Sequence, residues 1–164
     1  MPRPIIKLQK DRLDQMLEGI AILFVLVMVC LPLVAFQELP ETIPTHFNAS
    51  GEADGYGSRY TLLILPVIGS LMFAGLLVLN KYPHVFNYPE EITEANAAKH
   101  YRNGTKLIRW INLIIVVSFS FIEWRVIRSA SQGQGSLGPY FLPVFLTAIF
   151  GVIALYFWKS RREA

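Results

Sequence analysis

Four long apolar runs, separated by polar segments, set the pattern of this chain. They cover residues 17–36, 61–80, 107–127 and 140–158. The hydrocarbon core of a bilayer is roughly 30 Å thick, and about 20 helical residues are enough to cross it. Each run reaches that length or comes close to it. The pattern therefore predicts an all-α integral membrane protein, with four transmembrane helices that form a bundle within a single membrane domain, residues 1–164.

The polar segments predict how the chain crosses the membrane. An outward loop is expected at 37–60 and a cytoplasmic segment at 81–106, because Lys and Arg are enriched in cytoplasmic loops. Twelve of the 15 Lys and Arg lie before the first run, between positions 81 and 109, or after the fourth run. Both termini are therefore predicted to be cytoplasmic. The first run is longer than the roughly 7–15 apolar residues of a signal peptide core, so we expect a retained helix.

The composition is that of a membrane protein. Hydrophobic residues make up 53% of the chain and charged residues 16%, whereas soluble domains have about 25% charged residues. The net charge of +3 comes from basic residues on the predicted cytoplasmic side, so no nucleic-acid partner is expected. Cys30 is the only cysteine, which excludes an intrachain disulfide and a metal site built from cysteines. No cofactor is predicted.

The outward loop is rich in residues that form turns. Asp54-Gly55 is a strong signal for a tight turn, and Gly51 and Gly57 are positions where positive φ is expected. Residues 44–47 are expected to be extended, because a proline restricts the residue before it. A loop with this much turn chemistry is predicted to be a compact, structured cap between the first two helices.

The same loop carries a family resemblance. Its characteristic residues are Ile43-Pro44-Thr45-His46-Phe47-Asn48, Gly51 and Asp54-Gly55-Tyr56-Gly57-Ser58-Arg59. This pattern resembles the signature of an uncharacterised bacterial membrane domain, which also opens the SdpI-type immunity proteins. Those proteins protect a producing cell from its own secreted toxic peptide and contain further spans. The resemblance covers roughly residues 17–80. A following segment is similar to short stand-alone members of the family, through Asn87, Pro89, Thr93, Asn96 and Tyr101.

The resemblance implies a function and a location. It implies a non-catalytic recognition, immunity or sensing module in the bacterial cytoplasmic (inner) membrane, which presents an extracytoplasmic cap. Besides the lipid bilayer, the implied partner is a secreted peptide or an envelope component. The residues that would contact this ligand are those of the signature: Pro44, His46, Phe47, Asn48, Gly51, Asp54, Gly55, Ser58 and Arg59.

The third apolar run contains a row of polar residues. Arg109, Asn112, Ser120 and Glu123 recur at helical spacing, so they share one face. Such a seam is typical of an ion or substrate path, or of a helix interface bridged by hydrogen bonds. Val116 in the middle of the row favours the interface. Before this run, residue 93 is predicted to cap a helix that lies on the membrane surface or continues into the run.

Two alternative functions remain open from the residues alone. One is an accessory subunit that binds another membrane protein of a transport complex. The other is a small transporter or membrane enzyme that uses His46, Asp54 and Glu123, which share the outward side. Zinc usually takes several His or Cys ligands at short spacing, and His84 and His100 are predicted to lie on the cytoplasmic side. We therefore predict no metal site and no catalytic residue, and expect the loop polar groups to bond within the loop.

Overall fold

The computed structural model describes residues 3–133 and 136–162. The remaining positions of the predicted domain, at both ends and at 134–135, lie outside the described residues. Within the described part, four helices are long and apolar enough to span a membrane, as predicted. They are α1 (Arg12–Ala35), α2 (Ile64–Leu79), α3 (Ala97–Gln132) and α4 (Phe141–Arg162).

Local capping explains why two helices begin where they do. The helix α1 begins five residues before its apolar run, because Asp11 caps it. The Asp14 amide donates to Asp11 Oδ1 at 2.9 Å, and the Asp11 amide donates to Asp14 Oδ2 at 3.0 Å, which is a capping box. A 3₁₀ turn, Arg59–Leu63, leads into α2. Pro66 lies in the first turn of α2, where helical amides have no intrahelical acceptor.

The helix α3 is continuous from Ala97 to Gln132, 36 residues, and so extends beyond the roughly 30 Å hydrocarbon core. The expected cap at Thr93 is wrong. The Thr93 amide instead donates to Asn96 Oδ1 at 2.8 Å, which organises a turn just before the helix. Of the two alternatives for this segment, the structure shows the helix continuing into the third run.

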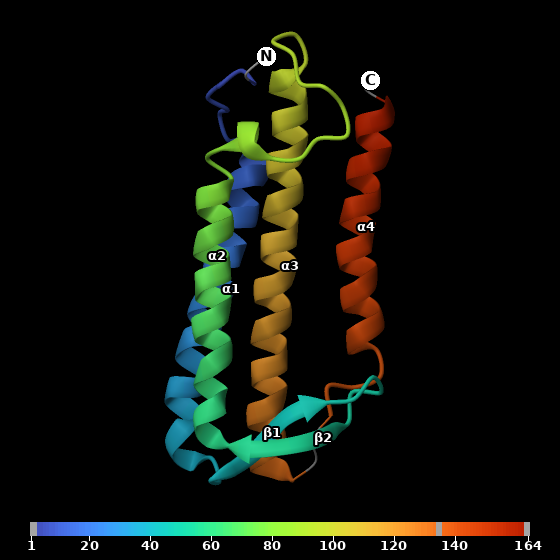
Figure 1. Cartoon of the computed structure of the whole chain (residues 1–164). Helices are drawn as coiled ribbons and strands as arrows, with labels where there is room; N and C mark the ends of the chain where they lie inside the picture. The colour runs from blue at the N-terminus through green and yellow to red at the C-terminus, as the bar shows by residue number, and fades with distance from the viewer. Residues whose placement is uncertain (1–2, 134–135, 163–164) are drawn as a thin grey trace.

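The helices are packed unevenly. In Figure 1, α1, α2 and α3 lie together and α4 stands beside α3, away from α1 and α2. The start of α1 and the end of α4 lie at one end, here called the terminal end. The contact of α2 with its neighbours is close, since a Cβ on Gly69 would lie 2.6 Å from Met28 Cε. Such close fits hold helices together where lipid provides no hydrophobic driving force.

The all-α prediction is wrong in one element, because the loop between the first two apolar runs, which is predicted to face outward, contains a two-stranded antiparallel sheet. The strands β1 (Thr42–Phe47) and β2 (Ala53–Ser58) form a hairpin. It lies at the opposite end of the molecule from the termini (Figure 1), here called the hairpin end. Its inner side packs on the helices, where Leu39, Ile43, Leu62 and Val126 form a buried apolar cluster.

The turn of the hairpin is at Asn48–Gly51, so the prediction of a tight turn at Asp54-Gly55 is wrong. Asn48 Oδ1 accepts from the amides of Ser50 at 2.9 Å and Glu52 at 3.0 Å. Gly51 has a φ of 80°, as expected, whereas Gly57 has no positive φ. The tip is held against the segment before α4, since the Leu137 amide donates to the Gly51 carbonyl at 2.6 Å.

Candidate functional site

A cavity of about 430 Å³ lies beneath the hairpin, and we call it the hairpin cavity. Its walls come from β1, the start of α2 and the hairpin end of α3. The cavity therefore forms only when residues as far apart in the chain as Ile43 and Glu123 are packed together. Four lining residues are polar: Thr45, His46, Thr61 and Glu123. The others are apolar: Ile43, Pro44, Phe47, Leu62, Ile64, Leu65, Ile122, Val126 and Leu137.

Glu123 is the one acidic side chain of the cavity wall, and it is 1% exposed. Neither carboxylate oxygen has a hydrogen-bond partner among the described residues. Buried carboxylates are usually paired or hydrogen-bonded, because desolvation of an isolated charge is costly. The arrangement therefore leaves a buried acid facing a mainly apolar space.

His46 lines the cavity, and its side chain bonds to Asp54 across the two strands. His46 Nδ1 is 2.5 Å from Asp54 Oδ1, and the side chains are 72% and 45% exposed. Gly55 faces His46 at this point. A Cβ on Gly55 would lie 2.9 Å from His46 Cβ, so a larger residue would push the strands apart. Gly55 thus serves close strand pairing, not a turn.

The other signature residues divide into two groups. Pro44 and Phe47 line the cavity with His46. Ser58 and Arg59 brace the backbone, since Ser58 Oγ accepts from the Tyr60 amide at 3.4 Å and Arg59 Nη1 donates to the Leu39 carbonyl at 3.0 Å. Together with Asn48 and Gly51 in the turn, these residues hold the hairpin in shape. The predicted recognition set is thus partly cavity wall and partly framework.

The polar seam of α3 lies inside the three-helix cluster. Arg109, Asn112, Ser120 and Glu123 are all buried. Asn112 Nδ2 donates to the Phe73 carbonyl of α2 at 3.3 Å, and Ser120 Oγ donates to the Phe24 carbonyl of α1 at 2.9 Å. The middle of the seam therefore bridges α3 to both neighbours. Its two charged members lie at opposite ends, in different surroundings.

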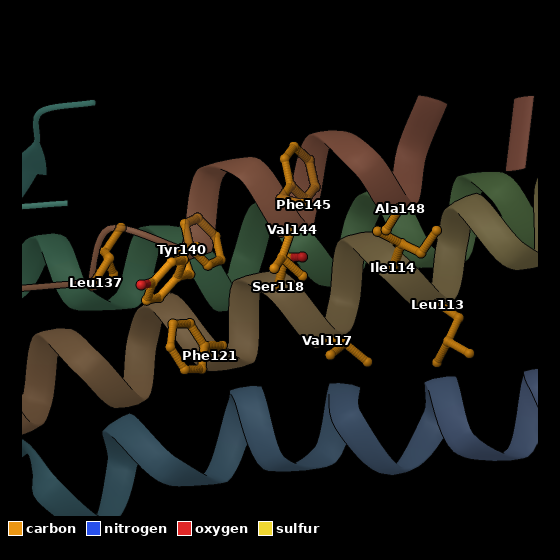
Figure 2. A pocket seen from close by; sticks show the side chains of 12 residues that line it. Leu113, Ile114, Val117, Ser118, Phe121, Leu137, Tyr140, Val144, Phe145 and Ala148 are labelled. Carbon is orange, nitrogen blue, oxygen red and sulfur yellow. The ribbon is translucent and has the colours of Figure 1, made fainter. Parts of the chain in front are cut away.

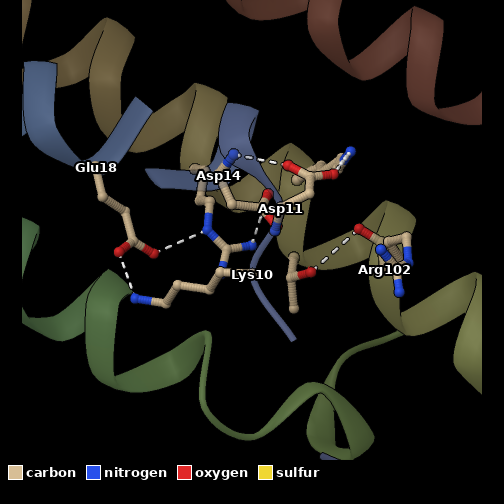
Figure 3. Close-up of polar contacts among 8 residues, drawn as sticks. Lys10, Asp11, Asp14, Glu18 and Arg102 are labelled. Carbon is tan, nitrogen blue, oxygen red and sulfur yellow. Dashed lines mark hydrogen bonds and ion pairs between the residues drawn. The ribbon is translucent and has the colours of Figure 1, made fainter. Parts of the chain in front are cut away.

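At the terminal end, Arg109 belongs to an ion-pair network that sequence reasoning missed. Its guanidinium is 2.9 Å from Glu18 Oε1 and 3.3 Å from Asp14 Oδ1, and Lys10 also pairs with Glu18. Figure 3 shows Lys10, Asp14 and Glu18 gathered at the start of α1. The available signal was the spacing of four between Asp14 and Glu18, which places both on one helix face.

Asp11 extends this network by pairing with Lys106. Lys106 Nζ is 2.5 Å from Asp11 Oδ2. The hydrogen bond from Lys106 and the bond from the Asp14 amide lower the pKa of the Asp11 carboxyl below its ordinary value. The network therefore ties the beginning of α1 to α3 by charge as well as by packing.

The predicted cytoplasmic motif does not gather into one site. Asn87 and Pro89 are exposed, whereas Tyr101 is fully buried and donates to the Pro4 carbonyl at 3.0 Å. Its ring lies 5.5 Å from that of Tyr88, and burial raises the pKa of the Tyr88 hydroxyl. These residues fasten the N-terminal segment to the connection before α3.

A larger apolar groove runs between α3 and α4, with a volume of about 580 Å³, and we call it the α3–α4 groove. Figure 2 shows Phe121 of α3 and Phe145 of α4 among the side chains that line it. Phe121 stacks on Phe141 with ring centroids 5.4 Å apart. Leu137 lines both this groove and the hairpin cavity, so the two spaces meet at one side chain.

Comparisons with known proteins agree with the uncharacterised domain expected from the signature. A family described as a domain of unknown function, DUF1648, matches residues 23–69, which cover most of α1, the hairpin and the start of α2. An uncharacterized protein of Archaeoglobus fulgidus is 30% identical over 161 residues, which span 90% of this chain and 85% of that protein. No solved structure matches.

Proposed function

This chain belongs to the same family as the uncharacterized Archaeoglobus fulgidus protein, and we propose that it is a multi-pass membrane protein whose hairpin cavity recognises an extracytoplasmic ligand. Its residues 23–69 match the DUF1648 domain. One observation carries the proposal. The signature residues Pro44, His46 and Phe47 form one wall of a cavity whose opposite wall is α3. Concave, mainly apolar sites with a few polar groups are where small ligands bind.

The proposed orientation places both termini in the cytoplasm and the hairpin outside a bacterial inner membrane. The basic side chains support it, because twelve lie in the segments of the terminal end and only Arg59, Arg125 and Arg128 lie near the hairpin end. An excess of Lys and Arg marks the cytoplasmic side. In this orientation the hairpin cavity is open to molecules that arrive from outside the cell.

The proposed ligand is a secreted peptide or an envelope component, because the signature resembles that of the SdpI-type immunity proteins, which protect a cell from its own secreted toxic peptide. Binding is proposed to be non-catalytic. In the described part of the chain, neither carboxylate oxygen of Glu123 is hydrogen-bonded to a base or a nucleophile, and no cluster of His, Cys, Asp and Glu that could hold a metal ion is present. The braced hairpin favours recognition, since a pre-formed site loses less entropy on binding.

The proposal is tested by filling the cavity. Leu65 is half-buried and lines the cavity, so Leu65→Trp should occupy the space that a ligand needs. Leu71, on the same helix, is 68% exposed, and Leu71→Trp is the matched control. The probe is octanol, measured by equilibrium binding to protein in phosphatidylcholine nanodiscs and corrected with empty nanodiscs.

We expect saturable octanol binding in the wild type and in Leu71→Trp, and its loss in Leu65→Trp. Equal binding in all three proteins would contradict the cavity as a ligand site. The immunity form of the proposal adds a survival assay. Where a toxic peptide is encoded beside the gene, cells that express the chain should survive that peptide, and Leu65→Trp should remove the protection while Leu71→Trp retains it. Unchanged protection in Leu65→Trp would refute a role for the cavity.

A further inference from the structure

The two charged residues at the ends of the α3 seam differ in their partners. Arg109, at the terminal end, is 7% exposed and has two carboxylate partners, Asp14 and Glu18. Glu123, at the hairpin end, is at least as deeply buried and has no ion-pair or hydrogen-bond partner in the described segments. The protein thus compensates its buried cation and leaves its buried acid facing the hairpin cavity.

The nearby cations do not serve Glu123, because each is held elsewhere. Arg125 donates from Nε to the Ser136 carbonyl at 2.5 Å. Arg128 donates to Gln132 Oε1 at 3.3 Å, and both guanidinium groups lie 5.6 Å from the ring centre of Trp124. Arg59 bonds to the Leu39 carbonyl, as described above. His46 lines the same cavity, but its Nδ1 is held by Asp54 Oδ1 at 2.5 Å. Since these groups are all engaged elsewhere, a positive charge that pairs with Glu123 would come from a ligand.

The surroundings of Glu123 select the kind of cation. Hard metal ions take six or more oxygen ligands, whereas most of the cavity wall is carbon. Thr45 and Thr61 add two hydroxyl groups, which are too few to complete such a shell. A protonated amine needs far less, because its three N–H groups donate to a carboxylate and to single neutral acceptors. The lining therefore favours an organic ammonium group over a metal ion.

The α3–α4 groove, which adjoins the hairpin cavity, favours an amine that carries an apolar chain. The α3–α4 groove and the hairpin cavity share Leu137 in their linings. The groove is lined almost entirely by apolar side chains, as Figure 2 shows. Ile122 of the cavity and Phe121 of the groove are consecutive on α3. An apolar chain that leaves the cavity past Leu137 would enter this groove and bury its surface there.

We propose that the ligand of the hairpin cavity is a cationic amphiphile, whose primary ammonium group pairs with Glu123 and whose apolar chain lies in the α3–α4 groove. This inference rests on the proposed function and gives its ligand a chemical class. The unpaired Glu123 carboxylate supports the ammonium group of this ligand by charge complementarity. Leu137, which lines both the hairpin cavity and the α3–α4 groove, supports the placement of the ligand's apolar chain.

The test compares two probes of equal chain length, octylamine and octanol, at pH 7. Binding is measured to protein in phosphatidylcholine nanodiscs, with empty nanodiscs subtracted. Wild type should bind octylamine at least about tenfold more tightly than octanol, since buried charge pairs couple strongly. Glu123→Gln keeps the shape and removes the charge, so it should lose that preference and keep its octanol affinity. Glu123→Asp should retain part of the preference.

The control is Glu38→Gln, which makes the same charge change at an exposed position of the hairpin end. It should leave both affinities unchanged. Equal affinity of the wild type for octylamine and octanol would overturn the inference and leave the proposed cavity intact. An amine preference that Glu123→Gln retains would also overturn it, because the charge would then act elsewhere. Absence of binding by both probes would overturn the cavity function itself.

Discussion

Replacing Arg109 by methionine should destabilise the protein strongly, because it removes the cation that faces buried Asp14 and partly buried Glu18. The guanidinium lies 2.9 Å from Glu18 and 3.3 Å from Asp14. At an effective dielectric constant of about 20, each pair attracts by roughly 5–6 kcal/mol before the cost of desolvation is subtracted. Asp14 is 4% exposed, so removing its partner leaves a buried charge, which costs about 3–5 kcal/mol in free energy of unfolding.

The assay is thermal unfolding of the purified protein in detergent micelles. A loss of about 3–5 kcal/mol corresponds to a decrease in Tm of roughly 6–20 °C for a chain of this size. Lys10→Gln is the control, because Lys10 is 51% exposed and an exposed ion pair contributes about 0–1 kcal/mol. Combining Arg109→Met with Asp14→Asn should recover part of the loss.

Two results would refute this reasoning about Arg109. The first is a decrease in Tm no larger than that of Lys10→Gln, which would mean that water reaches the network and screens it. The second is strict additivity of Arg109→Met and Asp14→Asn. Residues in one charge network should show a coupling energy of about 0.5–3 kcal/mol.

Two further predictions concern packing and pH. Gly69→Val should lower the free energy of unfolding by about 1–3 kcal/mol, because the added side chain would overpack against buried Met28. Gly75→Val should have little effect, because nothing lies within 4 Å of a Cβ at that position. Thermal unfolding measures both variants. The lowered pKa of Asp11 means that its pair with Lys106 stabilises the fold fully above the ordinary value of 3.8 and less as the pH falls through the lowered pKa. Lys106→Gln should remove that acid-dependent part of the Tm, and an unchanged pH profile would contradict it.

The spans were predictable from the sequence because their cause is local. A run of about 20 apolar residues leaves few alternatives to a membrane helix. The limits of the helices were less predictable, since they depend on side chains outside the runs. Asp11 caps α1 five residues early, and Asn96 uses its side chain on the preceding turn, so that α3 begins at Ala97.

The hairpin shows where local signals compete. Asp54-Gly55 is predicted to form the tight turn, but the turn forms at Asn48–Gly51 because Asn48 accepts two amide hydrogen bonds there. Asp54 is then free to pair with His46 across the strands.

The cavity was beyond sequence reasoning for a different reason. Glu123 was identified as a candidate from its place in the seam of α3. Its lack of a partner was not predictable, because that depends on β1, α2 and α3 meeting and on where the guanidinium groups of Arg125 and Arg128 are held. Contacts between residues far apart in the chain decide this.

The labelling rate of a cysteine in the cavity wall is the most direct test of the hairpin cavity as an outward-facing ligand site. Thr45 is exposed and lines the hairpin cavity, so Thr45→Cys, with Cys30 replaced by alanine, is treated with an impermeant maleimide in right-side-out membrane vesicles. Ser50→Cys in the hairpin turn and Ala95→Cys at the terminal end are controls.

We expect labelling at positions 45 and 50 and none at 95, with octylamine slowing the reaction at 45 but not at 50. Labelling at 95 without labelling at 45 and 50 would show that the hairpin faces the cytoplasm. A rate at 45 that octylamine leaves unchanged would contradict the hairpin cavity as a binding site for a cationic amphiphile.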